Sequence, residues 1–128
     1  MKNLNIYKNK KIIITGHTGF KGSWLSLWLN YLGAKIYGIS DKILTNPSNF
    51  RINSKNIFRE SYFFDLKNQE KLKSVIKKIK PDFIFHLAAQ ALVKKSYNDP
   101  YSTFISNSIG TLNLLNSLKN IKLKKKCS

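Results

Sequence analysis

The stretch "IIITGHTGFKGSW", residues 12–24, carries the strongest structural signal in this sequence. A short run of isoleucines, typical of a buried strand, leads directly into three glycines and then into an apolar run. The glycines are Gly16, Gly19 and Gly22. A strand that breaks into a glycine turn and continues as a helix is the setting in which the backbone can approach a phosphate group. The stretch therefore predicts a phosphate-binding turn, provided that the remaining chain builds a parallel sheet around it.

Apolar periodicity along the chain predicts that sheet. Strands are expected at Lys11–Thr15, Lys35–Ser40, Ser61–Leu66 and Asp82–Ala89. Helices are expected at Phe20–Leu32, ended by Gly33, between a cap at Asn68 and a stop at Pro81, and from Asp99-Pro100 to about Leu118. The alternation predicts an α/β fold, a partial Rossmann-like doubly wound parallel sheet of about four strands flanked by helices.

Several side chains in these elements have an expected structural role. Trp24 and Trp28 lie four residues apart and are expected to pack the first helix on the sheet. His86 is expected to be a core histidine inside the fourth strand. The lysines between residues 67 and 80 are expected to form a solvated helix face.

Composition bounds the class of protein. The chain has 128 residues, 42% of them hydrophobic, which fits a single domain over 1–128. Its net charge of +17 would suit a nucleic-acid binder, but only Arg51 and Arg59 are arginines, the residue best suited to phosphate and guanine contacts. We therefore expect no nucleic acid as the main partner. The lone cysteine, Cys127, excludes a disulfide within the chain, and no apolar run is long enough to span a bilayer, so a cytoplasmic protein without a membrane partner is expected.

The three glycines have distinct expected roles in binding a dinucleotide. Gly16 would permit the tight turn, Gly19 would let the backbone approach the pyrophosphate, and Gly22 would let the helix pack closely on the strand. The alternative is a glycine turn without a ligand. Its position after the first strand and at the start of a helix favours the dinucleotide site.

An acid at the end of the second strand would bind the ribose hydroxyls, and the candidates there are Ser40 and Asp41. Asp41 has the required chemistry, although it lies one residue past the ideal position and could equally be a solvated loop acid. No arginine is nearby to take a 2′-phosphate, which favours NAD over NADP, while Lys42 leaves NADP open.

Four strings carry a resemblance to a known family: "TGHTGFKGSWLSLWL" (15–29), "TNPSNF" (45–50), "FHLAAQALVKKSY" (85–97) and "SNSIGTLNLL" (106–115). They resemble the extended short-chain dehydrogenase/reductases, the NAD-dependent epimerase/dehydratase family. The first two strings resemble its CDP-glucose 4,6-dehydratases in particular. The resemblance runs from Lys10 to about Leu118.

The resemblance implies a set of cofactor-binding residues for NAD. In the pyrophosphate loop these are Gly16, Thr18, Gly19, Phe20, Lys21 and Gly22. Asp65 and Leu66 would flank the adenine at the end of the third strand. Leu87, Ala88 and Ala89 would line the cofactor after the fourth strand. Asn107 matches the asparagine of the family's "TNVxGT" element near the nicotinamide, although Ser106 and Ser108 replace Thr and Val, and the loop 90–97 faces the sugar in relatives.

The chain departs from the family at the catalytic residues. The family uses a Tyr-x-x-x-Lys pair, in which the lysine lowers the tyrosine pKa so that it acts as a base. Tyr7 with Lys11 and Tyr31 with Lys35 have this spacing, but neither pair is expected to lie on one helix. No catalytic or metal-binding residue is therefore assigned. We expect the basic tail 122–128 to be the polar link toward a fifth strand, so the chain is expected to be a truncated, N-terminal NAD-binding part.

The resemblance implies the function of a complete relative. Such an enzyme oxidises C4 of CDP-glucose with bound NAD, eliminates water across C5 and C6, and returns the hydride to C6. Its product, CDP-4-keto-6-deoxyglucose, is a precursor of deoxysugars for surface polysaccharide. The chain by itself is expected to be inactive, and its unpaired fourth strand could support a homo-oligomer. The alternatives are a non-catalytic nucleotide-binding module and a basic nucleic-acid binder.

Overall fold

The computed structural model describes residues 4–43, 46–54, 56–119 and 121. In chain order the elements are η1 (Leu4–Tyr7), β1 (Lys11–Thr15), α1 (Phe20–Tyr31), β2 (Lys35–Ser40), α2 (Asn49–Asn53), β3 (Phe58–Phe63), α3 (Gln69–Ile79), β4 (Phe83–His86), α4 (Val93–Asn98) and α5 (Pro100–Leu118). Thr45 of the "TNPSNF" string, Cys127 and the basic tail 122–128 lie outside the described residues.

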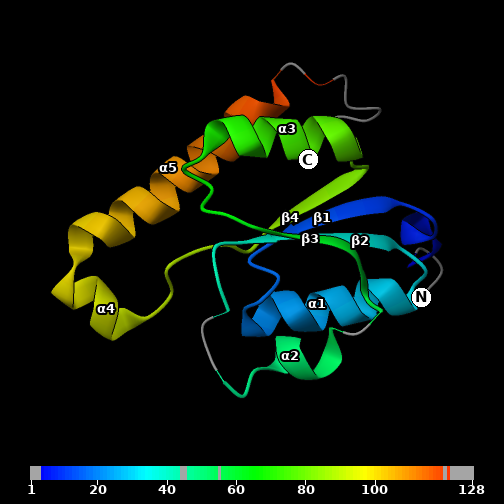
Figure 1. Ribbon diagram of the computed structural model, residues 1–128, viewed down its shortest axis with the longest axis horizontal. Coiled ribbons are helices and arrows are strands. Elements are labelled where there is room, and N and C mark those ends of the chain that lie inside the picture. Colours follow the sequence, from blue (N-terminus) through cyan, green and yellow to red (C-terminus); the bar gives the residue numbers. More distant parts are fainter. Residues whose placement is uncertain (1–3, 44–45, 55, 120, 122–128) are drawn as a thin grey trace.

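The four strands form one parallel sheet in the order β3-β2-β1-β4. Figure 1 shows α1 and α2 on one face of this sheet and α3 and α5 on the other. The predicted doubly wound α/β fold is therefore confirmed, and β1 and β2 have the predicted bounds. In such a sheet the carboxyl ends of the strands share one edge, and ligands bind there.

The central strand β1 is buried on both faces. Ile12 and Ile14 belong to the hydrophobic cluster that includes Leu29 of α1, whereas Ile13 belongs to the cluster with Leu72 of α3. Alternate side chains of a strand point to opposite faces, so the isoleucine run contributes to both cores. This burial fixes the end of β1, and with it the position of the glycine turn that follows.

Helix α1 meets the sheet through small residues rather than through its tryptophans. Its buried residues are Gly22, Ser23, Ser26 and Leu29. Trp24 and Trp28 are 49% and 50% exposed, so the prediction that they pack α1 on the sheet is wrong. The reason is steric, because a Cβ on Gly22 would lie 2.1 Å from the Gly16 carbonyl oxygen. A helix face that lies this close to the strand has no room for an indole ring.

Two strands differ from their predicted bounds. β3 begins at Phe58 and ends at Phe63, because it pairs with β2 from Ile36↔Phe58 to Ser40↔Phe63. As an edge strand it tolerates the charged residues Arg59 and Glu60, which lie outside the predicted strand. β4 ends at His86 because its partner β1 ends at Thr15, the residue paired with His86.

Side-chain caps set the limits of the long helices on the second face. The Asn68 side chain accepts a hydrogen bond from the Lys71 backbone N–H at 3.0 Å, and Asp99 accepts one from Ser102 at 3.0 Å, as the sequence predicted. In α3 the lysines are exposed, which confirms the solvated face. The short helices α2 and α4 were not predicted. None of the described helices combines the length and the apolar composition that a membrane span requires.

Candidate functional site

The turn between β1 and α1 requires glycine at two positions. Gly16 has a φ of +74°, and a Cβ there would lie 2.8 Å from backbone atoms of Leu87 and Ala88. Its N–H donates to the Ile39 carbonyl at 2.8 Å, which joins the turn to β2. Gly22 lacks room for a side chain on the inner face of α1. The turn is thus held by backbone contacts with the ends of both β2 and β4.

The N-terminus of α1 presents bare backbone at this edge of the sheet. Gly19 is the N-cap residue and has no side chain with which to cap the first turn. Within 4 Å of a Cβ built on Gly19, the one described neighbour outside its immediate chain is the Gly16 carbonyl oxygen, at 3.3 Å. The side chains of Phe20 and Lys21 are exposed. The N–H groups and the positive end of the helix dipole can therefore act on an anion placed beside Gly19.

His17 is fully buried behind the turn and was not predicted as a site residue. Its ring contacts Phe50, Phe58 and Phe63 edge-on or tilted. Its Nδ1 lies 2.9 Å from the Ser40 hydroxyl. Burial lowers the pKa of His17 to about 4, so the ring is neutral near pH 7.

The feature of the sequence that could have pointed to His17 is Gly38, a glycine inside the strand β2. A Cβ on Gly38 would lie 2.2 Å from Cδ2 of the His17 ring. A glycine within a strand often marks a close approach of another group, and here the group is this imidazole.

Thr18 and Ser40 connect the turn to the end of β2. The Thr18 N–H donates to the Ser40 hydroxyl oxygen at 3.3 Å, and the Thr18 hydroxyl donates to the Lys42 carbonyl at 2.7 Å. Since the Ser40 hydroxyl also contacts His17 and is 5% exposed, its contacts here are within the protein. Asp41 is the exposed acid beside it, and its Oδ1 accepts the Lys42 N–H at 2.8 Å. Asp41 is therefore better placed than Ser40 to meet an incoming ligand.

Asp65 and Leu66 lie in the turn beyond β3 rather than at the end of the strand. The Leu66 side chain is buried in the core with Leu114, which leaves its backbone as the part available to a ligand. Asp65 is exposed, and its Oδ1 accepts the Lys67 N–H at 2.9 Å. The structure thus puts the Asp65 carboxylate at the start of the turn that leads into α3.

The segment 87–89 follows β4 and lies against the glycine turn. The N–H groups of Leu87 and Ala88 donate to the Thr15 hydroxyl oxygen at 3.1 and 3.2 Å. His86, half-buried at the end of β4, contacts the same hydroxyl through Nδ1 at 2.7 Å. The expected core histidine is thus a hydrogen-bonded residue at the strand end.

Asn107 of α5 uses its amide on the protein backbone. Gln90 donates its N–H to the Asn107 Oδ1 at 2.7 Å, and the Asn107 Nδ2 donates to the Gln90 carbonyl at 3.2 Å. Asn107 therefore holds the segment after β4. Any effect of Asn107 on a nicotinamide would be indirect, through the position of that segment.

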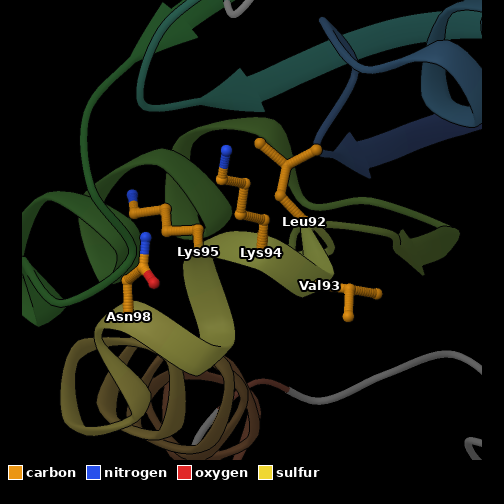
Figure 2. Close-up of a pocket in the computed structure, with 5 residues that line it drawn as sticks. All are labelled: Leu92, Val93, Lys94, Lys95 and Asn98. Carbon is orange, nitrogen blue, oxygen red and sulfur yellow. The ribbon is translucent and has the colours of Figure 1, made fainter.

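The predicted sugar-facing loop 90–97 is largely helical. A hollow of about 490 Å³ is lined by Leu92, Val93, Lys94, Lys95 and Asn98, whose side chains are drawn in Figure 2. The side chains of Lys94, Lys95 and Asn98 extend to the same side of α4, while Val93 points elsewhere. None of the predicted cofactor-binding residues lines this hollow.

Tyrosine–lysine pairs with catalytic spacing do not share a helix in the described chain. Tyr7 precedes β1 and Lys11 begins it, while Tyr31 ends α1 and Lys35 begins β2. Tyr62 does contact Lys78 at 3.2 Å, but burial raises the pKa of Tyr62, opposite to what a tyrosine base requires. The described residues also contain no group of three His, Cys, Asp or Glu side chains that could hold a metal ion.

Comparison with known proteins adds a family to this geometry. Residues 13–128 match the model of the family described as GDP-mannose 4,6 dehydratase. A CDP-glucose 4,6-dehydratase of Salmonella typhimurium is 44% identical over 117 residues, which cover 91% of this chain and 33% of that protein. The chain thus spans about a third of the length of this curated relative.

Solved structures share the fold. An epimerase of Methanothermobacter thermautotrophicus has a TM-score of 0.79 at 27% identity, covering 95% of this chain and 35% of that protein. A UDP-glucose 4-epimerase of Thermus thermophilus, solved in complex with NAD, has a TM-score of 0.77 at 27% identity, with coverages of 88% and 35%.

Proposed function

The chain belongs to the GDP-mannose 4,6 dehydratase family, and we propose that it is the NAD-binding part of a nucleotide-sugar dehydratase acting on CDP-glucose. The observation that carries the proposal is the turn between β1 and α1. Gly19 leaves the first turn of α1 without a side-chain cap, at the edge of the sheet where β1, β2 and β4 end.

The residues at this edge fit a dinucleotide. The uncapped first turn of α1, beside Gly19, suits the pyrophosphate because both its N–H groups and its dipole favour negative charge. Asp41 follows β2 and suits the ribose hydroxyls, as an acceptor for two O–H donors. Leu87 to Ala89 would line the cofactor on the far side of the turn, with Asp65 and the Leu66 backbone toward the adenine. Thr18, held to Lys42, would fix the loop that carries these contacts.

CDP-glucose is proposed as the sugar nucleotide on the strength of sequence similarity. The dehydratase of Salmonella typhimurium that carries that name is 44% identical to this chain, a higher identity than that of the compared epimerase structures. In the complete reaction NAD would accept a hydride from the sugar and return it after water is lost. Within this chain no tyrosine and lysine of catalytic spacing share a described helix, so the residues assigned here bind and orient without acting as the acid or base.

Titration calorimetry with NAD tests the proposal. Gly19→Val places a branched side chain where the pyrophosphate would approach, and we expect it to raise the Kd at least about 100-fold, since loss of several phosphate contacts exceeds 2.7 kcal/mol. Ser61→Val, at an exposed position of β3, is the matched control and should bind NAD as the parent does. If Gly19→Val and Ser61→Val bind NAD equally well, the turn is not the cofactor site.

A further inference from the structure

A chain of hydrogen bonds runs from the glycine turn through His86 to α5. The Thr15 hydroxyl lies 2.7 Å from His86 Nδ1, and His86 Nε2 lies 2.9 Å from the Thr111 hydroxyl. Thr111 in turn donates its hydroxyl proton to the Asn107 carbonyl at 2.7 Å, within the same helix. The chain thus joins the ends of β1 and β4 to the middle of α5.

The two hydroxyl groups fix which nitrogen of His86 carries the proton. Each threonine hydroxyl has one proton to donate. Thr111 gives its proton to Asn107, so it can only accept from His86, and Nε2 must carry a hydrogen. Nδ1 is then an acceptor and takes the proton of Thr15, whose oxygen accepts the N–H groups of Leu87 and Ala88.

The orientation of the Thr15 hydroxyl matters because the segment it holds touches the turn. Leu87 and Ala88 present the backbone atoms that would lie 2.8 Å from a Cβ on Gly16. With its proton directed at His86, Thr15 presents its lone pairs to both N–H groups at once. Without an acceptor at His86, the hydroxyl would turn toward other partners and Ala88 would lose its anchor, whereas the Leu87 N–H also donates to the Thr15 carbonyl at 3.1 Å and keeps that bond.

We propose that His86, as the neutral tautomer protonated on Nε2, is a positioning residue that holds the segment 87–88 against Gly16 and so shapes the cofactor site. The inference rests on the proposed NAD site for its effect on binding. We call the hydrogen-bonded arrangement of Thr111, His86 and Thr15 with the segment 87–88 the clamp. Its geometry follows from these hydrogen bonds alone.

The test uses Thr111, because its replacement changes the clamp without touching the turn. Thr111→Val keeps the shape of the side chain but leaves His86 Nε2–H without its acceptor, and Thr111→Ser, which keeps the hydroxyl, is the matched control. Nitrogen-15 NMR of the parent reports the tautomer, amide hydrogen exchange reports the order of Leu87 and Ala88, and calorimetry reports NAD affinity. We expect Thr111→Val to speed exchange at Ala88 and raise the NAD Kd, each about tenfold, while Thr111→Ser stays within about twofold of the parent. Leu87 keeps the Thr15 carbonyl as an acceptor and should respond less.

Each readout has an outcome that overturns the inference. A parent His86 protonated on Nδ1 would contradict the tautomer. Unchanged exchange at Ala88 in Thr111→Val would contradict the clamp, as would an equal acceleration at Ile13 in β1, which would mean general destabilisation. If the parent binds no NAD, the proposed function fails, and the tautomer and exchange still decide whether His86 positions this segment. If NAD binds and the exchange changes while the Kd does not, the role in the cofactor site is refuted.

Discussion

Lowering the pH from about 7.5 to about 5 is expected to destabilise the protein through His17. The ring is fully buried and its pKa is lowered from 6.5 to about 4, mainly because burial penalises the charged form. In the unfolded chain the pKa is 6.5, so between pH 6.5 and 4 the unfolded state binds a proton that the folded state does not. Stability therefore falls as the pH decreases through this window and is fully retained above it.

The magnitude follows from the difference between the two pKa values. Each tenfold difference in proton affinity corresponds to about 1.4 kcal/mol, so His17 should cost about 2 kcal/mol at pH 5 and about 3 kcal/mol below pH 4. Urea unfolding followed by circular dichroism over this pH range measures the free energy of unfolding. His17→Phe keeps a ring among Phe50, Phe58 and Phe63 but cannot titrate.

The variant separates His17 from the other histidine. The pKa of His86 is also lowered by burial, and because His86 remains in His17→Phe, the difference between the two pH profiles isolates His17. We expect the variant to be less stable at neutral pH, because Ser40 loses a partner, yet flatter toward acid. Parallel profiles would refute the reasoning. So would an NMR titration of the parent that gives His17 a pKa near 6.5.

Three further results are expected. Gly38→Ala should lower the free energy of unfolding by about 1–3 kcal/mol in urea titrations, because its Cβ would overlap the His17 ring. In a His17→Ala background most of that loss should disappear, and equal losses in both backgrounds would contradict the contact. Calorimetry should give NAD a lower Kd than NADP, and equal Kd values for the two cofactors in the parent would overturn the predicted preference. Asp41→Ala should weaken NAD binding about tenfold, whereas Glu70→Ala, at another exposed acid, should stay within about twofold of the parent. The chain alone should form no 4-keto product from CDP-glucose and NAD, because each missing acid–base group typically costs about 10²–10⁴ in rate, and product formed in proportion to the chain would refute it.

Local sequence patterns predicted much of the architecture because the signals are local. The isoleucines of β1 and the run of β2 mark buried parallel strands, and both strands have the predicted bounds. Asn68 and Asp99 mark helix starts, since each side chain caps a backbone N–H three residues ahead. The glycine turn was predictable for the same reason, because a strand followed by glycines and a helix is a pattern of neighbouring residues.

The bounds of β3 and β4 depended on their partners. Each of these strands ends opposite the last residue of the neighbour with which it pairs, and that pairing joins residues far apart in the sequence. The prediction from apolar content alone therefore placed β3 too far toward the C-terminus and made β4 too long.

The sequence alone predicted the order of the four strands and of the three long helices, and the position of the turn. Which side chains meet at that turn depends on the tertiary structure. Periodicity put Trp24 and Trp28 on one helix face, but the contact between Gly22 and Gly16 selected the opposite face for the sheet. Likewise, His86 contacts Thr111 only because the fold brings α5 beside the end of β4. These contacts depend on the separation and orientation of packed elements, and local propensity carries no information about either.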